Sequence, residues 1–237
     1  MPERFEPALS AAVAAIADAG SDDVSVYLYG SVATGRASCP RSDVDLLTVG
    51  LASSRAAELG GELSRQFSGL CRGIELAAVS PGELAGESDE AYGNRVFLRH
   101  YCVHLAGQDR AHDLPGFPAD VRAARGFNGD IAKHAGRWQT QFAAGDDPRQ
   151  LGRRLARKTL LAVAGLVSIH DAAWTTDRAL AAGRWAEIDP ELRAALPVLL
   201  AWSGGQGLPG RREVGRMLDV PIPRIVAAFA SAIGLWP

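Results

Sequence analysis

Cysteine is scarce in this sequence. Only Cys39, Cys71 and Cys102 occur among 237 residues, and their spacing does not suggest pairs. A disulfide framework needs paired cysteines, so this usage is typical of a protein from a reducing compartment. Residues 1–20 lack the basic leader and uninterrupted apolar core of a signal peptide, and their pattern is that of an amphipathic helix. We therefore expect a cytoplasmic protein.

Long apolar runs are also missing. The two longest, residues 160–169 and 225–236, are too short to cross a bilayer as helices, so we expect no membrane partner. Positive charge is not in excess either, because the formal net charge is −2. This balance, together with the lack of basic runs interleaved with aromatic residues, argues against a nucleic-acid partner.

Lysine is nearly absent, since only Lys133 and Lys158 occur among the 25 basic residues, and we attribute this to genomic base composition. The distribution of charge is more informative. Residues 1–118 carry 9 Lys and Arg against 16 Asp and Glu, whereas residues 119–237 carry 16 against 11. An acidic half beside a basic half suits a site with metal on one side and phosphate on the other. It equally suits simple attraction between two domains.

The pattern of the first half alternates between strand and helix. Runs rich in β-branched and aromatic residues are separated by segments with helical periodicity, and hydrophobic residues make up 47% of the chain, enough for a substantial core. We expect strands over residues 24–30, 42–50, 73–80 and 100–107, and helices over residues 5–18, 54–68 and 88–99. This alternation predicts an α/β (α+β) domain over residues 1–115.

A linker follows the fourth predicted strand. Residues 106–120 contain Gly107, Pro115, Gly116 and Pro118, which favour turns and irregular chain. Beyond it the strand pattern stops, and helices are expected over residues 119–143, 148–171, 177–186, 190–203, 210–219 and 222–234. The sequence therefore predicts a second, all-α domain over residues 119–237.

The stretch GSVATGRASCPRSDVDLL, residues 30–47, carries the main chemical signal. Asp43 and Asp45 lie two residues apart in a predicted strand, so they project from the same face, and paired carboxylates suit Mg²⁺. Gly30 and Ser31 form a turn that lets phosphate oxygens approach the backbone. Glu75 in the next strand supplies a third carboxylate. Two metal ions held by such a cluster would serve phosphoryl-type transfer.

This order of motifs resembles the nucleotidyltransferase superfamily related to DNA polymerase beta. The resemblance is closest to the aminoglycoside (spectinomycin and streptomycin) adenylyltransferases. It is strong over residues 27–80, extends to residues 88–107, and is thin beyond residue 150. It implies a catalytic domain with a mixed sheet and a following helical domain. It also implies Mg²⁺-dependent transfer of AMP from ATP to a hydroxyl of a small molecule, such as an aminoglycoside or aminocyclitol antibiotic.

The resemblance also implies roles for individual residues. It assigns contacts with the phosphates of ATP to Gly30, Ser31 and Ser42, and it assigns Mg²⁺ to Asp43 and Asp45. Glu75 would act as the general base on the acceptor hydroxyl, or as a further metal ligand, and the sequence favours neither role over the other. Both ATP and Mg²⁺ are therefore expected to bind.

The chain departs from this family in its second half. In the adenylyltransferases, an arginine in the helix after the linker and a lysine at the start of the next helix contact ATP. The matching positions here are Gly165 and, for the lysine, Arg178. The acidic residues that face a cationic drug in the family have no clear match, and the nearest acids are Asp146 and Asp147. These departures affect the expected acceptor more than the expected chemistry.

A basic stripe marks the predicted helix over residues 148–171. It consists of Arg153, Arg154, Arg157 and Lys158, and it becomes apolar one turn further on. The stripe could line a cleft between the domains and face the triphosphate, which makes Arg157 and Lys158 candidate nucleotide ligands. It could equally be a surface patch that forms salt bridges.

Three alternatives remain beside the main interpretation. His100, Cys102 and His104 alternate along a predicted strand, which is the pattern of a soft-metal site, although we expect an ordinary buried face. The acceptor of AMP could be a protein, as in antitoxins that modify a partner toxin. The chain could also be a regulator that binds ATP without turnover.

Overall fold

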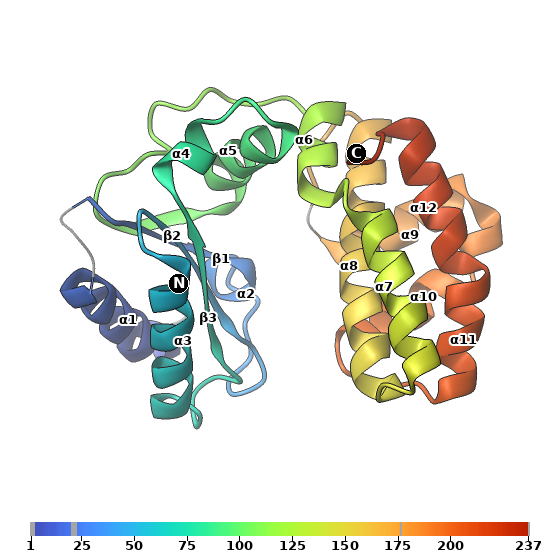
Figure 1. Cartoon of the computed structure of the whole chain (residues 1–237), viewed down its shortest axis with the longest axis horizontal. Helices are drawn as coiled ribbons and strands as arrows, with labels where there is room; N and C mark the ends of the chain where they lie inside the picture. The colour runs from blue at the N-terminus through green and yellow to red at the C-terminus, as the bar shows by residue number, and fades with distance from the viewer. Residues whose placement is uncertain (1–2, 20–22, 176, 237) are drawn as a thin grey trace. The chain divides into compact units, whose positions relative to one another are not determined.

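The computed structural model describes residues 3–19, 23–175 and 177–236, and the chain divides into two compact units, Met1–Gly116 and Phe117–Pro237 (Figure 1). The first unit contains a sheet with helices, and the described part of the second contains helices without strands. The predicted fold class, an α/β region with a mixed sheet followed by an all-α region, is therefore confirmed.

The sheet of the first unit has four strands in the order β3-β2-β1-β4. The strands are β1 (Ser25–Tyr29), β2 (Val44–Val49), β3 (Ile74–Val79) and β4 (Val103–Ala106). The pair β2–β3 is parallel, whereas β1 runs antiparallel to both β2 and β4. The sheet is therefore mixed, and β3 forms one of its edges.

Hydrophobic side chains cover both faces of the central strands. On one face, Leu28 and Leu46 pack with residues of α1 (Glu6–Ala19) and α3 (Ser53–Gln66). On the other face, Tyr27 and Leu47 pack with Leu98 of α5 (Asp89–Tyr101). Three short helices complete this unit, namely η1 (Glu3–Phe5), α2 (Gly30–Ala33) and α4 (Pro81–Ala85). The second face carries the smaller cluster, and it is the face on which the odd-numbered residues of β2 lie.

The region around residue 100 differs from the prediction. The side chain of Ser88 accepts a hydrogen bond from the backbone of Ala91 and caps α5, which continues to Tyr101. His100 is therefore helical, and the expected alternation of His100, Cys102 and His104 along one strand is wrong. His104 lies in β4 against the ring of Tyr27, with ring centroids 5.3 Å apart. These residues do not share a strand face and form no soft-metal trio.

The second unit is built around one long helix. This helix is α8 (Pro148–His170), and thirteen of its residues are buried. It contacts each of the other α-helices of the unit (Figure 1). These are α6 (Val121–Asn128), α7 (Ile131–Ala144), α9 (Arg178–Ile188), α10 (Ala195–Ser203), α11 (Arg211–Asp219) and α12 (Pro221–Ala232), with η2 (Pro190–Leu192) after α9.

The helix expected over residues 119–143 is interrupted. Helix α6 ends at Asn128, and α7 begins at Ile131. The indole of Trp236 packs on Gly129 at this break, where an added Cβ would lie 2.2 Å from the Trp236 ring. Trp236 also donates hydrogen bonds to the carbonyls of Arg125 and Gly129, at 2.8 and 2.9 Å. A long-range contact therefore stabilises a break that helical periodicity does not reveal.

Among the helices in the described ranges, none is both long enough and apolar enough to cross a bilayer.

Candidate active site

Three side chains form a row across the end of the sheet. Tyr29 of β1 is paired with Asp45 of β2, and Asp45 is paired with Glu75 of β3. Paired residues on neighbouring strands point to the same side, so the two carboxylates and the phenol share one face. Burial raises the pKa of Tyr29, and the charges of Asp45 and Glu75 raise it further. The structure thus brings together two of the three predicted carboxylates.

Gly30 lies directly against Asp45. Its φ of +73° is one that glycine adopts readily, and an added Cβ would lie 2.2 Å from Asp45 Oδ2. The predicted turn at Gly30 and Ser31 is the first turn of the short helix α2, which Thr34 closes by donating its hydroxyl proton to the Gly30 carbonyl at 3.1 Å. The absence of a side chain at residue 30 therefore lets the backbone approach the carboxylate.

Ser42 has a local structural role next to this site. Its hydroxyl oxygen accepts a hydrogen bond from the backbone of Ser38 at 2.9 Å, and its own backbone donates to the Ser38 carbonyl at 2.8 Å. A hydroxyl that accepts one hydrogen bond can still donate another. The predicted contact between Ser42 and a phosphate is compatible with this geometry and stays a prediction.

Asp43 is paired with an arginine. Arg72 donates from Nε to Asp43 Oδ1 at 2.8 Å and from Nη2 to the other carboxylate oxygen. Asp43 Oδ1 also lies 3.7 Å from the position that a Cβ on Gly73 would take. Asp43 therefore faces the start of β3, whereas Asp45 faces Gly30.

The carboxylates suit Mg²⁺ in their chemistry. Asp43, Asp45 and Glu75 offer only oxygen ligands, which Mg²⁺ prefers, and Asp45 and Glu75 are neighbours in register. Within the ranges that the structure describes, however, no three His, Cys, Asp or Glu side chains are grouped as a metal site. Asp43 is instead paired with Arg72. Asp45 and Glu75 could hold a cation, and Asp43 could join them if Arg72 turned away.

Sequence reasoning missed Tyr29 and Arg72. The signal for Arg72 is the parallel pairing of β2 with β3, in which Val44 is paired with Ile74 and Asp45 with Glu75. This offset places residue 72 beside residues 42 and 43, so an arginine there lies within reach of Asp43. The pairing direction of the two strands was needed to find it.

The basic candidates of the second unit have partners within that unit. Arg157 donates to the carbonyl of Ser203 at 3.3 Å. Lys158 pairs with Asp130 at 2.8 Å and donates to the carbonyl of Phe127 at 3.3 Å. Both side chains are half-buried. These contacts favour the structural interpretation of the basic stripe, and a role in nucleotide binding stays a prediction.

Two positions bear on the departures from the family pattern. Gly165 is buried in the core of the second unit, where an added Cβ would meet Phe229 at 3.5 Å and Ala124 at 3.9 Å. An arginine at this position would lie among the apolar residues of this core. Arg178 is the first residue of α9, directly after the capping residue Asp177. Arg178 remains the candidate for a nucleotide contact from this unit.

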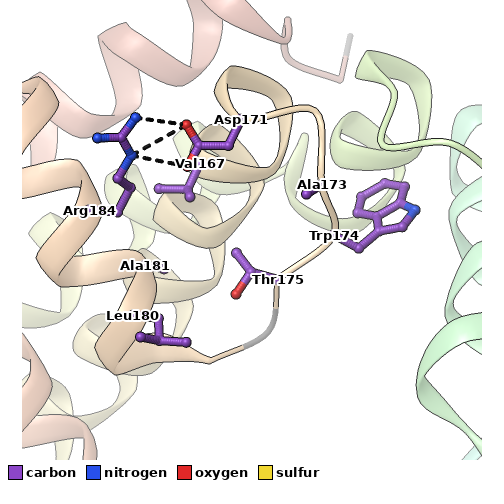
Figure 2. Close-up of a pocket in the computed structure, with 8 residues that line it drawn as sticks. All are labelled: Val167, Asp171, Ala173, Trp174, Thr175, Leu180, Ala181 and Arg184. Carbon is purple, nitrogen blue, oxygen red and sulfur yellow. Dashed lines mark hydrogen bonds and ion pairs between the residues drawn. The ribbon is translucent and has the colours of Figure 1, made fainter.

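A pocket of about 290 Å³ lies between the end of α8 and α9 (Figure 2). Its charged residues bind each other, since Arg184 Nε lies 3.0 Å from Asp171 Oδ2. Hydrogen bonds from Arg184, and then from His170, lower the pKa of Asp171 to about 2. The apolar part of the lining includes Val167, Trp174, Leu180 and Ala181. The pocket could therefore accept an apolar or aromatic group but offers no unpaired charge among these residues.

Comparisons with known proteins identify the fold. No protein-family model and no curated protein sequence matches the chain. Among solved structures, it is similar to spectinomycin adenyltransferase AAD(9) from Enterococcus faecialis, which was crystallised with ATP and spectinomycin. The TM-score is 0.68 at 13% sequence identity, and the match covers 94% of this chain and 98% of that chain. The similarity extends over both units and shows that the two proteins share a fold.

Proposed function

We propose that this chain is a nucleotidyltransferase that transfers AMP from ATP to a hydroxyl of a small molecule. The observation that carries the proposal is the row of Asp45 and Glu75 beside Gly30, on a fold shared with an adenyltransferase. Residues 1–115 would form the catalytic domain, and residues 119–237 would supply contacts with the nucleotide and the acceptor.

The proposed phosphate site lies where β1 leads into α2. We propose that phosphate oxygens bind there, where the hydroxyls of Ser31 and Ser42 can donate to them. Asp43 and Asp45 would hold Mg²⁺. Mg²⁺ bound there would neutralise charge on the phosphates and on the leaving pyrophosphate.

We propose that Glu75 acts on the acceptor. It is exposed and belongs to β3, an edge strand of the sheet, so an acceptor can reach it from solvent. As the general base, Glu75 takes the proton of the acceptor hydroxyl. The hydroxyl oxygen then bonds to the α-phosphorus of ATP, and the bond from that phosphorus to the bridging oxygen breaks to release pyrophosphate. Tyr29 remains protonated at neutral pH, because burial and both carboxylates raise its pKa.

We propose the acceptor as a class of compound and not as a single molecule. The similar structure was solved with spectinomycin, which supports an aminoglycoside or aminocyclitol. The acids nearest to the family's drug-binding positions have other partners here. Asp146 pairs with Arg154 at 3.4 Å, and Asp147 caps α8 by accepting hydrogen bonds from the backbone of residues 149 and 150. We therefore propose a small-molecule hydroxyl, of which these antibiotics are the first to test.

The test is pyrophosphate release from ATP and Mg²⁺ with a panel of aminoglycosides, aminocyclitols and related polyols. We expect release with at least one acceptor and a product heavier by one AMP in mass spectrometry. Incubation with labelled ATP and cell lysate tests for a protein acceptor. ATP binding by calorimetry, without release in any of these mixtures, would contradict the proposal and favour a regulator that binds ATP.

Lys158 gives a prediction about the second unit. Because Lys158 pairs with the half-buried Asp130, Lys158→Ala should lower the free energy of unfolding by about 1–2 kcal/mol and the melting temperature by a few degrees. Thermal unfolding without ATP measures this. Arg212→Ala, at an exposed position of α11, is the matched control and should have little effect. Weaker ATP binding at unchanged stability would show instead that Lys158 contacts the nucleotide.

A further inference from the structure

The pair of Arg72 and Asp43 is fixed by the pairing of its strands. The backbone N–H of Arg72 donates to the Ser42 carbonyl at 3.0 Å, and that of Val44 donates to the Gly73 carbonyl at 2.9 Å. These two bonds place the Cα atoms of Arg72 and Asp43 on adjacent segments just before β3 and β2. The backbone pairing of β2 with β3 thus continues past the strand ends and holds Arg72 beside Asp43.

Arg72 engages both oxygens of Asp43. Nε and Nη2 each donate to a different carboxylate oxygen, which is the two-point geometry that makes arginine pairs strong. The Asp43 side chain is only 17% exposed, so solvent screens the pair incompletely. A metal ion that used Asp43 as a ligand would need at least one of these oxygens. The guanidinium and the metal thus compete for the same atoms.

Asp45 and Glu75 lie at the same end of the sheet as Asp43. Asp45 faces Gly30, Glu75 lies beside Asp45 in register, and the charges of both raise the pKa of Tyr29. Neutralisation of Asp43 by Arg72 lowers the total negative charge at this end of the sheet. The same neutralisation removes part of the attraction that would draw a divalent cation in.

We propose that Arg72 pairs with Asp43 while no metal ion is bound, and that the metal ion displaces Arg72 from Asp43 when it binds. This inference rests on the proposed function, because it concerns the same cation site. Arg72 acts through Asp43 and is a positioning residue. The exchange breaks an ion pair each time a metal ion binds, so Arg72 weakens the affinity of the free protein for metal.

The probe is Mn²⁺, whose free concentration can be measured by electron paramagnetic resonance. Arg72→Gln should tighten Mn²⁺ binding by about tenfold, the size expected for loss of a competing two-point ion pair. Arg72→Lys keeps the positive charge but loses the planar guanidinium that donates to both carboxylate oxygens. Its Mn²⁺ affinity should therefore lie between those of the wild type and Arg72→Gln. Arg65→Gln removes the same charge from an exposed position of α3 and should bind Mn²⁺ as the wild type does.

A second measurement does not depend on direct detection of the metal. The rise in melting temperature on adding Mn²⁺ should be larger for Arg72→Gln than for the wild type, because tighter ligand binding stabilises the folded state more. In an Asp43→Asn background, Arg72→Gln should leave Mn²⁺ affinity unchanged, which shows that Arg72 acts through Asp43.

The outcomes separate this inference from the proposed function. Suppose that the wild type binds Mn²⁺ and that Asp45→Asn abolishes this binding. If Arg72→Gln then leaves Mn²⁺ affinity unchanged or weakens it, the cation site is supported but the proposed role of Arg72 is overturned. If Mn²⁺ binds no variant in a way that depends on Asp45, both the cation site and the exchange are overturned. Tighter binding by Arg72→Gln that persists without Asp43 would also overturn the exchange, because the effect would then be one of net charge.

Discussion

Asp45→Asn should lower the rate of AMP transfer by about 10³-fold or more while the fold remains intact. Asp45 is the central member of the row at the end of the sheet, with Tyr29 on one side and Glu75 on the other. An amide is a poorer Mg²⁺ ligand than a carboxylate, and loss of the metal removes several kcal/mol of charge stabilisation in the transition state. Pyrophosphate release measures the loss, and circular dichroism on heating checks the fold.

Asp113→Asn serves as the control, since it makes the same change at an exposed loop position and should retain full activity. Asp43→Asn should also abolish transfer. Because Asp43→Asn removes the ion pair with Arg72, it should also cost about 1 kcal/mol of stability without metal. Normal turnover in either site variant would refute the role of the paired aspartates.

Glu75→Gln should separate catalysis from binding. The amide keeps the shape and reach of the side chain but cannot take a proton, so transfer should slow by roughly 10²–10⁴-fold, the usual contribution of a general base. The affinity for ATP and Mg²⁺ should stay near that of the wild type. Isothermal titration measures the affinity, and pyrophosphate release measures the rate on the same protein samples.

Two other results for Glu75→Gln have distinct meanings. A fall in affinity together with the rate would show that Glu75 is chiefly a metal ligand. Unchanged turnover would remove Glu75 from the mechanism. Glu62→Gln, on the exposed side of α3, is the matched control and should change neither quantity.

The fold was predictable where local pattern and packing agree. Residues 24–30 are rich in β-branched and aromatic side chains, and the structure forms β1 there because both of its faces are covered by core. The prediction failed at two helix boundaries. Helix α5 continues to Tyr101, past the end expected at residue 99, and Trp236 packs at the break between α6 and α7. Helical periodicity determines neither the last residue of a helix nor a contact with a distant residue.

The candidate site was predictable in its residue types and only partly in its geometry. The spacing of Asp43, Asp45 and Glu75 indicated carboxylates on neighbouring strands, and the register places Asp45 beside Glu75. Strand periodicity gives a face but not the direction of each side chain, so the turn of Asp43 toward Arg72 could not be foreseen. Likewise, helical spacing grouped Arg157 with Lys158 but did not identify Ser203 and Asp130 as their partners.

The strand order β3-β2-β1-β4 has a consequence for the chain during its synthesis. β1 gains β2 as a neighbour early, but its other edge stays unpaired until Val103–Ala106 has left the ribosome. At ordinary translation rates that interval lasts roughly 3–10 s. Throughout it, an apolar strand offers open N–H and C=O groups to any other nascent chain nearby. The rate of translation between β2 and β4 thus sets how long the unpaired edge of β1 can pair with another chain.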